Sequence, residues 1–329
     1  MKKILSLVLV AALLALSCLA FASCETPAKD DGKYTVGICQ LLPHPALDAA
    51  TQGFMDTLVE ELGEENVTFL NENAGNDASV CTTIITNLVN KNVDLILANA
   101  TPALTAAVNG TDSIPILGTS ITEYGTALGI DNFNGLVGSN VSGTSDLAPL
   151  DEQADMIVTL FPEAEKFALL YCSSEANSEY QVKEIRRLLV ENGIKDEDIK
   201  DYKFTDSNDV NTVSAAAAAF ADVIYVPTDN TAASCAETIR GAIGDTPLIA
   251  GDEGICTGCG VATLCINYYD LGVATGKMAI KILKGEEKIE NMKIAYADKF
   301  TKKYNPERCE ELGIDVEALK AAGYVAVGE

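Results

Sequence analysis

The amino-acid sequence predicts an α/β fold made of two doubly wound parallel-sheet lobes. From Lys33 onward, short runs rich in β-branched residues alternate with amphipathic segments of helical length. This alternation occurs as two series in tandem, separated by a stretch at 135–149 that is rich in Gly, Asn, Ser and Thr. With 329 residues, the chain is long enough for two domains. Because strands that alternate with helices form parallel sheets covered on both faces, each series predicts one lobe.

The first series begins with a strand at 34–39 and continues with a helix at 46–62. The apolar residues Phe54, Leu58 and Leu62 recur at the spacing of one helix face. The remaining elements of this series are expected to be strands at 67–70, 93–98 and 114–117, with helices at 78–90 and 102–108.

The second series has the same alternation. Its helices are expected at 151–160, 178–192, 210–219 and 232–243, and its strands at 166–171, near 199–204, at 222–226 and at 247–250. A later helix is expected at 268–283, where Lys284-Gly285 is a typical end signal.

Residues 1–23 have the order of a secretory signal peptide. Lys2 and Lys3 are followed by an apolar stretch at 4–21 and then by small residues before Cys24. The run Phe21-Ala-Ser-Cys24 resembles the bacterial lipobox, in which the cysteine is lipidated and becomes the first mature residue. Residues 24–32 would then be a lipidated, polar tether.

Two alternatives to lipidation at Cys24 remain: simple cleavage after Ala20-Phe-Ala22, and lipidation at Cys18. No later segment reaches the roughly 20 apolar residues that a membrane-spanning helix requires. The sequence therefore predicts an extracytoplasmic protein that an N-terminal lipid anchors to the cell membrane.

Charge and motif content exclude several classes of function. The formal net charge of −25 argues against nucleic acid as a partner, because phosphate binding requires a basic surface. The sequence contains no P-loop, no GxGxxG after the first strand, no G-x-S-x-G and no HExxH. We therefore expect no enzyme activity and no cofactor.

Eight cysteines follow Cys24, and most lie in apolar runs, where cysteine behaves as a small buried hydrophobe. Their disulfide pairing cannot be assigned from sequence. Cys256-Thr-Gly-Cys259 has CxxC spacing, but it lies in the Gly-rich stretch 254–260, which we expect to be a turn, whereas a thioredoxin-like motif opens a long helix after an early strand. A structural zinc site requires four ligands, and no second CxxC or His pair is present. Thiol-disulfide chemistry is thus a minor alternative function, and we expect no metal.

Polar residues follow most of the predicted strands, at the sheet edge where ligands bind in open parallel sheets. Hydroxyls and helix N-termini suit a carboxylate, and acidic residues suit an ammonium group, so an amino acid would satisfy both. Each polar run is also a plausible helix N-cap. His44, the only histidine, stands between two prolines and is expected to shape a turn. The candidate ligand-binding residues are Gln40, Thr101, Ser120, Thr122, Ser174, Glu175, Asn177, Thr228, Asp229, Asn230 and Asp252.

Several motifs together carry a family resemblance that covers nearly the whole mature chain. They include Gly37-Ile-Cys-Gln40, His44-Pro-Ala-Leu-Asp48, Asn140-Val-Ser-Gly-Thr-Ser-Asp146, Ser174-Glu-Ala-Asn177, Pro227-Thr-Asp-Asn230 and Tyr269-Asp-Leu-Gly272. With these motifs, the sequence resembles the ABC transporter substrate-binding lipoproteins related to the tryptophan/tyrosine-binding protein TrpX. The resemblance implies a type I periplasmic-binding fold: two Rossmann-like lobes, joined by a hinge, that clamp a ligand. It also implies an ABC permease and an ATPase as partners.

The resemblance also places the helix at 268–283 in the first lobe. The expected domains are then 33–147 plus 267–289 for lobe 1 and 148–266 plus 290–329 for lobe 2. We hypothesise a hinged clamp in which Thr101, Ser120 and nearby backbone amides of the first lobe hold a ligand carboxylate. The second lobe contributes Glu175, Asn177, Asp229, Asn230 and Asp252, and closure buries the ligand.

Two departures from the family pattern leave the identity of the ligand open. Many relatives have an aspartate-proline pair where this chain has Ser120-Ile-Thr-Glu-Tyr124, and small apolar residues near the positions of Cys256 and Cys259. Tryptophan, tyrosine, phenylalanine and another amino acid all remain candidates. A sugar or nucleoside fits less well, because the chain has no Trp to stack on a ring. A ligand sensor for a separate receptor is the main alternative function.

Overall fold

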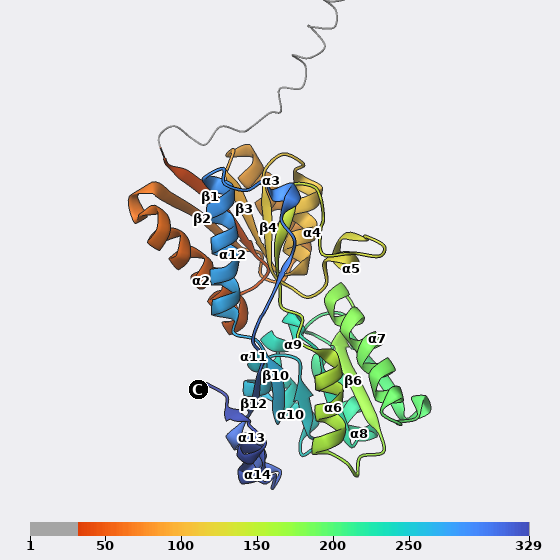
Figure 1. The fold of residues 1–329 in the computed structure, drawn as a ribbon. Helices are drawn as coiled ribbons and strands as arrows, with labels where there is room; N and C mark the ends of the chain where they lie inside the picture. The colour runs from red at the N-terminus through yellow and green to blue at the C-terminus, as the bar shows by residue number, and fades with distance from the viewer. Residues whose placement is uncertain (1–31, 329) are drawn as a thin grey trace, which may run out of the picture. The chain divides into compact units, whose positions relative to one another are not determined.

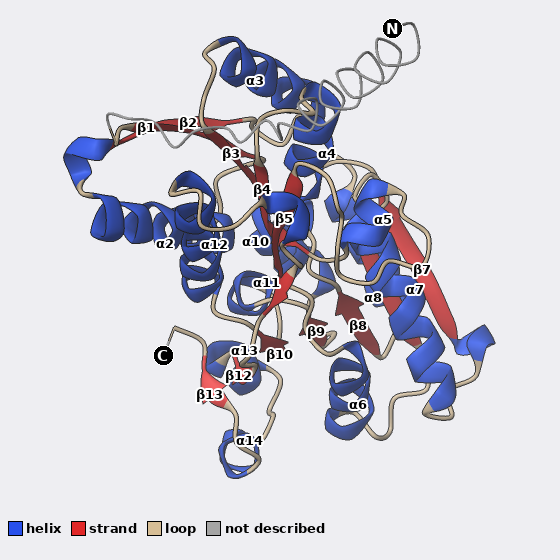
Figure 2. Cartoon of the chain, turned by 45° about the horizontal axis from the view of Figure 1, so that its top comes forward, coloured by secondary structure: helices blue, strands red, loops and turns tan. Residues whose placement is uncertain are grey.

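In the computed structural model, residues 32–328 are described, and they form two α/β lobes, each around one sheet (Figure 1). This confirms the predicted fold class. Helices lie on both faces of each sheet (Figure 2). The signal peptide and Cys24 lie outside the described residues. Within residues 32–328, no helix is both long and apolar enough to cross a membrane.

The first lobe is built from residues before 146 and from a later segment that returns to it. Its elements are β1 (Tyr34–Gln40), α2 (Pro45–Leu62), β2 (Val67–Asn73), α3 (Ala78–Asn90), β3 (Leu95–Asn99), α4 (Thr101–Gly110), β4 (Ile116–Ile121), α5 (Tyr124–Leu128), β5 (Val141–Ser145), α12 (Tyr268–Leu283) and β11 (Ala295–Tyr296). The strand order is β11-β5-β4-β3-β1-β2, and every pair is parallel.

The second lobe has a sheet in the order β13-β12-β10-β9-β8-β6-β7, in which only the β10–β12 pair is antiparallel. Its elements are α6 (Leu150–Leu160), β6 (Phe167–Cys172), α7 (Ala176–Glu191), β7 (Ile199–Phe204), α8 (Val210–Phe220), β8 (Val223–Val226), α9 (Asn230–Ser234), α10 (Ala236–Ile243), β9 (Leu248–Ala250), α11 (Glu253–Gly258), β10 (Ala262–Cys265), β12 (Thr301–Tyr304), α13 (Pro306–Glu311), α14 (Val316–Ala321) and β13 (Val325–Ala326). Short 3-10 helices lie at Glu64–Asn66, Asp196–Asp198 and Ile289–Asn291.

Several local predictions differ from the structure. The helix expected at 232–243 is two helices, α9 and α10, because the backbone leaves the helical region at Cys235. The segment 254–260 is not simply a turn: Asp252 caps the short helix α11 within it by accepting a hydrogen bond from the Ile255 amide at 2.9 Å. The stretch 135–149, expected to be only a connection, contains the buried strand β5.

The chain passes between the lobes three times, which follows from the sheet to which each strand belongs. The crossings are 146–149, 266–267 and 297–300. The last crossing comes later than the expected boundary after residue 289, because β11 pairs with β5 in the first sheet. The Tyr268 hydroxyl donates to Asp146 Oδ2 at 2.9 Å and so ties the first two crossings together.

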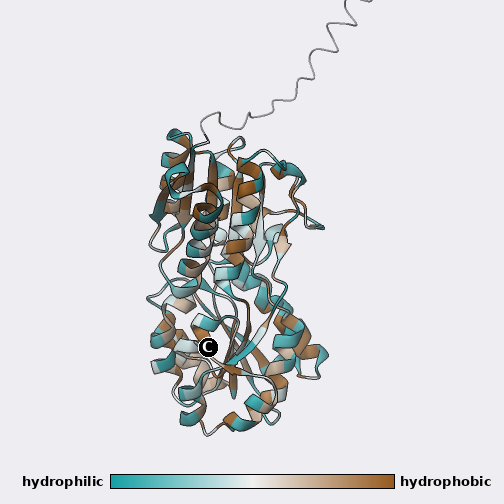
Figure 3. Cartoon of the chain, turned by 60° about the vertical axis from the view of Figure 1, so that its left-hand side comes forward, coloured by the Kyte–Doolittle hydropathy of each residue, from teal (hydrophilic) through white to brown (hydrophobic). Residues whose placement is uncertain are grey.

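Each sheet has an apolar core on both faces, and hydrophobic residues concentrate on the central strands (Figure 3). On one face of the first sheet, α2 and α12 pack with their backbones unusually close. Gly53, Gly272 and Gly276 make this possible, since a Cβ on Gly272 would lie 2.0 Å from the Ala50 carbonyl oxygen. This pairing holds α12, which follows the second crossing directly, firmly on the first lobe.

Candidate functional site

The two lobes meet at residues that follow the carboxyl ends of parallel strands. His44 and Asn76 follow β1 and β2 of the first lobe, and Asn230 and Thr231 follow β8 of the second. His44 Nε2 lies 3.4 Å from Asn230 Oδ1, and Asn76 Nδ2 donates to Thr231 Oγ1 at 3.1 Å. Open parallel sheets bind ligands at this edge, so the residues around these contacts form the candidate site.

Unpaired polar atoms mark this edge of both sheets. Of the eight buried side-chain N and O atoms in residues 32–328 that lack a hydrogen-bond partner, five lie at or just after the carboxyl end of a strand. These are His44 Nδ1, Asn99 Oδ1, Ser120 Oγ, Asp146 Oδ1 and Asn177 Oδ1. Burying a polar group without a partner is costly, and native proteins ordinarily satisfy such groups. These five atoms are therefore available for hydrogen bonds to a bound molecule.

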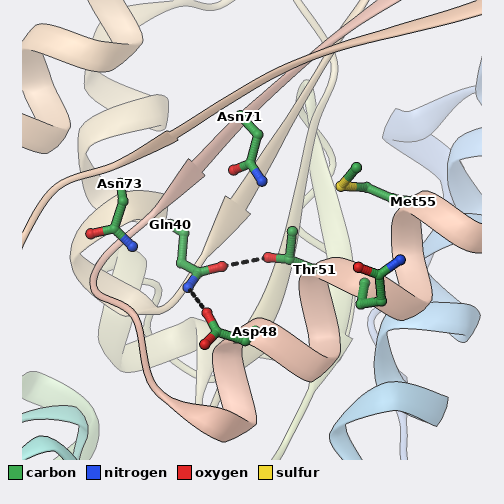
Figure 4. A pocket seen from close by; sticks show the side chains of 7 residues that line it. Gln40, Asp48, Thr51, Met55, Asn71 and Asn73 are labelled. Carbon is green, nitrogen blue, oxygen red and sulfur yellow. Dashed lines mark hydrogen bonds between the residues drawn. The ribbon is translucent and has the colours of Figure 1, made fainter.

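Gln40, at the end of β1, is used inside the first lobe. Its side-chain amide donates to Asp48 Oδ1 at 2.6 Å and accepts from Thr51 Oγ1 at 2.6 Å, so it ties the strand to α2 (Figure 4). Gln40 lines a polar pocket of about 340 Å³ between α2 and β2, together with Asp48, Thr51, Gln52, Met55, Asn71 and Asn73. The Thr51 hydroxyl also accepts a hydrogen bond from Asn99 Nδ2 at 2.9 Å. The other terminal atom of this amide, Asn99 Oδ1, has no hydrogen-bond partner.

The backbone is strained at the ends of β3 and β4. Ala100 has φ of 87° and Ser120 has φ of 56°, conformations that residues other than glycine rarely adopt. Thr101, the first residue of α4, and Ser120 are both buried. The two residues that sequence placed around a ligand carboxylate thus lie at neighbouring strand ends, in a backbone that the surrounding fold holds under strain.

Asp146, at the end of β5, was not among the predicted site residues, although the motif that ends in it was noted. It is buried, and this burial raises its pKa, whereas the hydroxyls of Thr122 and Tyr268 oppose the rise. Thr122 therefore supports Asp146, and its carbonyl accepts from Ser145 Oγ at 2.8 Å. The signal that could have identified Asp146 is its position directly after a strand.

Glu175 is buried and fully engaged within the second lobe. Its carboxylate accepts from the backbone amides of Asn230 and Thr231 at 3.1 and 2.9 Å. It also accepts from Asn230 Nδ2 at 2.7 Å and from Thr231 Oγ1 at 2.8 Å. The carboxylate therefore holds the start of α9, including both residues that contact the first lobe.

Three other predicted residues of the second lobe also serve its own structure. Asp229 accepts from the amides of Cys172 and Ala232, both at 2.7 Å, and burial raises its pKa to about 8. The Thr228 hydroxyl donates to the Gly251 carbonyl at 3.2 Å. Ser174 is exposed, and its hydroxyl donates to the Thr205 carbonyl at 3.0 Å.

Asn177 differs from these neighbours because the oxygen of its side-chain amide has no hydrogen-bond partner. Its Nδ2 donates to the Thr228 carbonyl at 3.0 Å and lies 3.3 Å from Glu175 Oε2. These contacts orient the side chain, and Oδ1 is buried without a partner. Of the predicted residues in the second lobe, Asn177 presents the clearest free hydrogen-bonding atom.

Titration of Asp252 is expected to make the folding stability of the protein depend measurably on pH. Burial raises its pKa to about 7 from an ordinary value of 3.8, so the folded state binds this proton more tightly than the unfolded state. Its contribution to stability is fully present below about pH 4 and is lost as the pH rises through about 7, at about 1.4 kcal/mol per unit of pKa difference.

Replacing Asp252 with asparagine keeps a capping oxygen but removes the titration. In thermal melts between pH 5 and 8.5, we expect the Asp252→Asn variant to lose less stability with rising pH than the wild type. Asp245→Asn, at an exposed position, is the matched control and should keep the wild-type profile. An Asp252→Asn profile that parallels the wild type would contradict this assignment.

The cysteines within residues 32–328 are all free thiols, and seven of the eight are buried, as their apolar surroundings predicted. Cys256 and Cys259 are fully buried, and this burial raises the pKa of both thiols. Burial disfavours the thiolate that redox chemistry and metal binding require. No group of three or more potential metal ligands occurs in the described part of the chain.

Comparisons with known proteins agree with this fold. The family model of the ABC transporter substrate binding proteins matches residues 35–324. A curated relative, the tyrosine-binding protein of Clostridioides difficile (strain R20291), is 34% identical over 299 residues, covering 87% of this chain and 85% of the relative.

Solved structures show the same similarity. An ABC domain from Streptococcus pneumonia in complex with L-Trp has a TM-score of 0.83 at 30% identity, covering 89% of this chain and 99% of that one. A ligand-free, open substrate-binding protein with adhesive properties from Clostridium difficile has 34% identity and the same coverage, but a TM-score of only 0.68. The chain as a whole is thus more similar in structure to the relative that contains L-Trp than to the open one, although the open relative is more similar in sequence.

Proposed function

This chain belongs to the family of ABC transporter substrate-binding proteins, and on that premise we propose that it captures an amino acid between its two lobes and delivers it to an ABC importer. Members of the family are extracytoplasmic solute-binding proteins, not enzymes, that bind a small molecule and work with a transporter. We further propose that Cys24 carries the lipid that holds the protein at the membrane, on the strength of the lipobox-like run before it.

The observation that carries the amino-acid proposal is the set of unpaired buried atoms at the strand ends of both lobes. The Ser120 hydroxyl can donate to a carboxylate, next to the N-terminus of α4, where free backbone amides favour an anion. Asp146 Oδ1 and Asn177 Oδ1 are acceptors, which suit an ammonium group. A zwitterion bound between the lobes would satisfy groups from both and so favour closure.

An aromatic side chain is the favoured choice within this class. The curated relative is named for binding tyrosine, and one similar structure contains L-Trp. We therefore propose tyrosine, tryptophan or phenylalanine as the ligand, with Ser120, Asn177 and Thr101 among the residues that contact it.

Thermal-shift and calorimetric titrations with L-tyrosine, L-tryptophan and L-phenylalanine test the proposal. We expect at least one of them to raise the melting temperature by several degrees, because a ligand that binds only the folded state stabilises it. L-alanine, L-glutamate and L-arginine should have smaller effects. No stabilisation by any amino acid would overturn the proposed function.

Two substitutions then locate the binding site. Ser120→Ala and Asn177→Ala should each weaken binding about tenfold, the cost of one buried hydrogen bond. Ser174→Ala is the matched control, because Ser174 also follows a strand but is exposed and bonded to the Thr205 carbonyl. Equal affinities in all three variants would exclude the strand-end site.

A further inference from the structure

His44 is the only histidine of the chain, and its imidazole lies where the two lobes meet. It occupies the N-cap position of α2, but its side chain makes no capping hydrogen bond there. The residue is 8% exposed, and Nδ1 has no hydrogen-bond partner. The flanking prolines suggested that His44 shapes a turn, but that role does not involve the imidazole ring.

Hydrogen bonding in the second lobe determines which way Asn230 faces His44. Asn230 Nδ2 donates to Glu175 Oε2 at 2.7 Å, and the carboxylate can only accept, so this atom must be the amide nitrogen. The other terminal atom, Oδ1, is then the one that lies 3.4 Å from His44 Nε2. An oxygen that only accepts requires a proton on Nε2.

The proton on Nε2 leaves Nδ1 as a bare acceptor. Burial lowers the pKa of His44, so the ring is neutral near pH 7 and carries a single proton. The ionisable groups that act on the ring from the elements around it are Asp48 on α2 and Glu175 before α7, and both are acidic. A buried acceptor in this negative surrounding suits a ligand group that is positively charged and donates hydrogen bonds.

We propose that His44 Nδ1 accepts a hydrogen bond from the α-ammonium group of the bound amino acid, and that Asn230 prepares it for this role. The inference rests on the proposed function and adds His44 to the residues that distinguish an amino acid from its deaminated analogue. Because Asn230 belongs to the other lobe, the acceptor form of the ring is fixed only when the lobes meet. Closure and recognition of the ammonium group are thereby coupled.

Pairs of ligands that differ only in the ammonium group test this assignment. Calorimetry would compare L-tyrosine with 3-(4-hydroxyphenyl)propionate, and L-tryptophan with indole-3-propionate. In the wild type we expect the amino acid to bind at least about 100-fold more tightly than its analogue, since a missing donor leaves buried acceptors unpaired. In His44→Ala this ratio should fall about tenfold or more, mainly through weaker binding of the amino acid.

Two variants separate recognition from closure. Asn230→Ala removes the group that sets the ring proton and should also lower the ratio. Asn76→Ala removes a second hydrogen bond between the lobes, the one to Thr231 Oγ1, and should weaken the binding of amino acid and analogue equally. A ratio unchanged in His44→Ala overturns this inference while leaving the proposed function intact. If the wild type binds no amino acid, the proposed function fails and the inference fails with it.

Nitrogen-15 NMR of the single imidazole gives a readout that a merely structural role would not change. With L-tyrosine bound, the protein should show a neutral ring protonated on Nε2 at pH 7, with its Nδ1 resonance shifted toward a hydrogen-bonded position. The analogue without the ammonium group should leave that resonance in place. A proton on Nδ1 in the bound protein would overturn the assignment.

Discussion

Replacing Gly272 with alanine should destabilise the first lobe by about 3 kcal/mol or more, the upper range for overpacking a close-packed interior. The added Cβ would lie 2.0 Å from the Ala50 carbonyl oxygen and 2.9 Å from the Phe54 amide nitrogen. Both are backbone atoms of α2, so no side chain can rotate away. The two helices would have to separate, and the packing that both make against the first sheet would be lost.

Gly241 provides the matched control for this substitution. It lies in the exposed part of α10, and a Cβ there would have no atom within 4 Å. Gly241→Ala should therefore be neutral or stabilise the protein by about 0.5–1 kcal/mol, because alanine is the better helix former. Urea unfolding followed by circular dichroism would compare the two variants, and equal stability would contradict the packing argument.

The loss of Glu175 is the second large effect. Glu175→Ala removes one carboxylate that accepts from Asn230 and Thr231 through both backbone and side chain. Several buried donors would be left without an acceptor, so we expect a loss of about 3 kcal/mol or more. Binding of L-tyrosine should weaken as well, since Asn230 and Asn177 would lose a group that orients them.

Glu179→Ala is the control for this second prediction. Glu179 lies in the first turn of the same helix, α7, but it is exposed, so its replacement should cost less than about 1 kcal/mol. Chemical denaturation would measure both stabilities, and calorimetry would measure the affinity for L-tyrosine. A Glu175→Ala variant as stable as Glu179→Ala would show that α9 does not depend on this carboxylate.

Most of the fold could be predicted from local patterns, because its strands are buried on both faces. Runs such as Leu95–Asn99 and Phe167–Cys172 are continuously buried, and each is followed by an amphipathic helix. One strand that escaped prediction, β5, is also buried but has no apolar run. β5 has the sequence VSGTS and is a strand because β4 and β11 flank it on either side, with Gly143 pressed against the backbone of Gly118.

The sequence could propose candidate site residues but could not show which of them have a free hydrogen-bonding atom. Polar residues after strands are either helix caps or ligand contacts, and both have the same appearance in a sequence. Asp229 and Asp252 are caps in the structure, and the oxygens of Glu175 are occupied by α9. Ser120 and Asn177 keep a free atom instead.

By itself, the sequence determined two parallel-sheet lobes and the family. Periodicity and the composition of strand ends are local properties of the sequence, so they can be recognised without knowledge of the tertiary contacts. Only the tertiary structure decided which polar atoms are already paired, because their partners lie far away along the chain. The clearest case is His44, which looked like part of a turn until Asn230, 186 residues later, was found 3.4 Å from its ring.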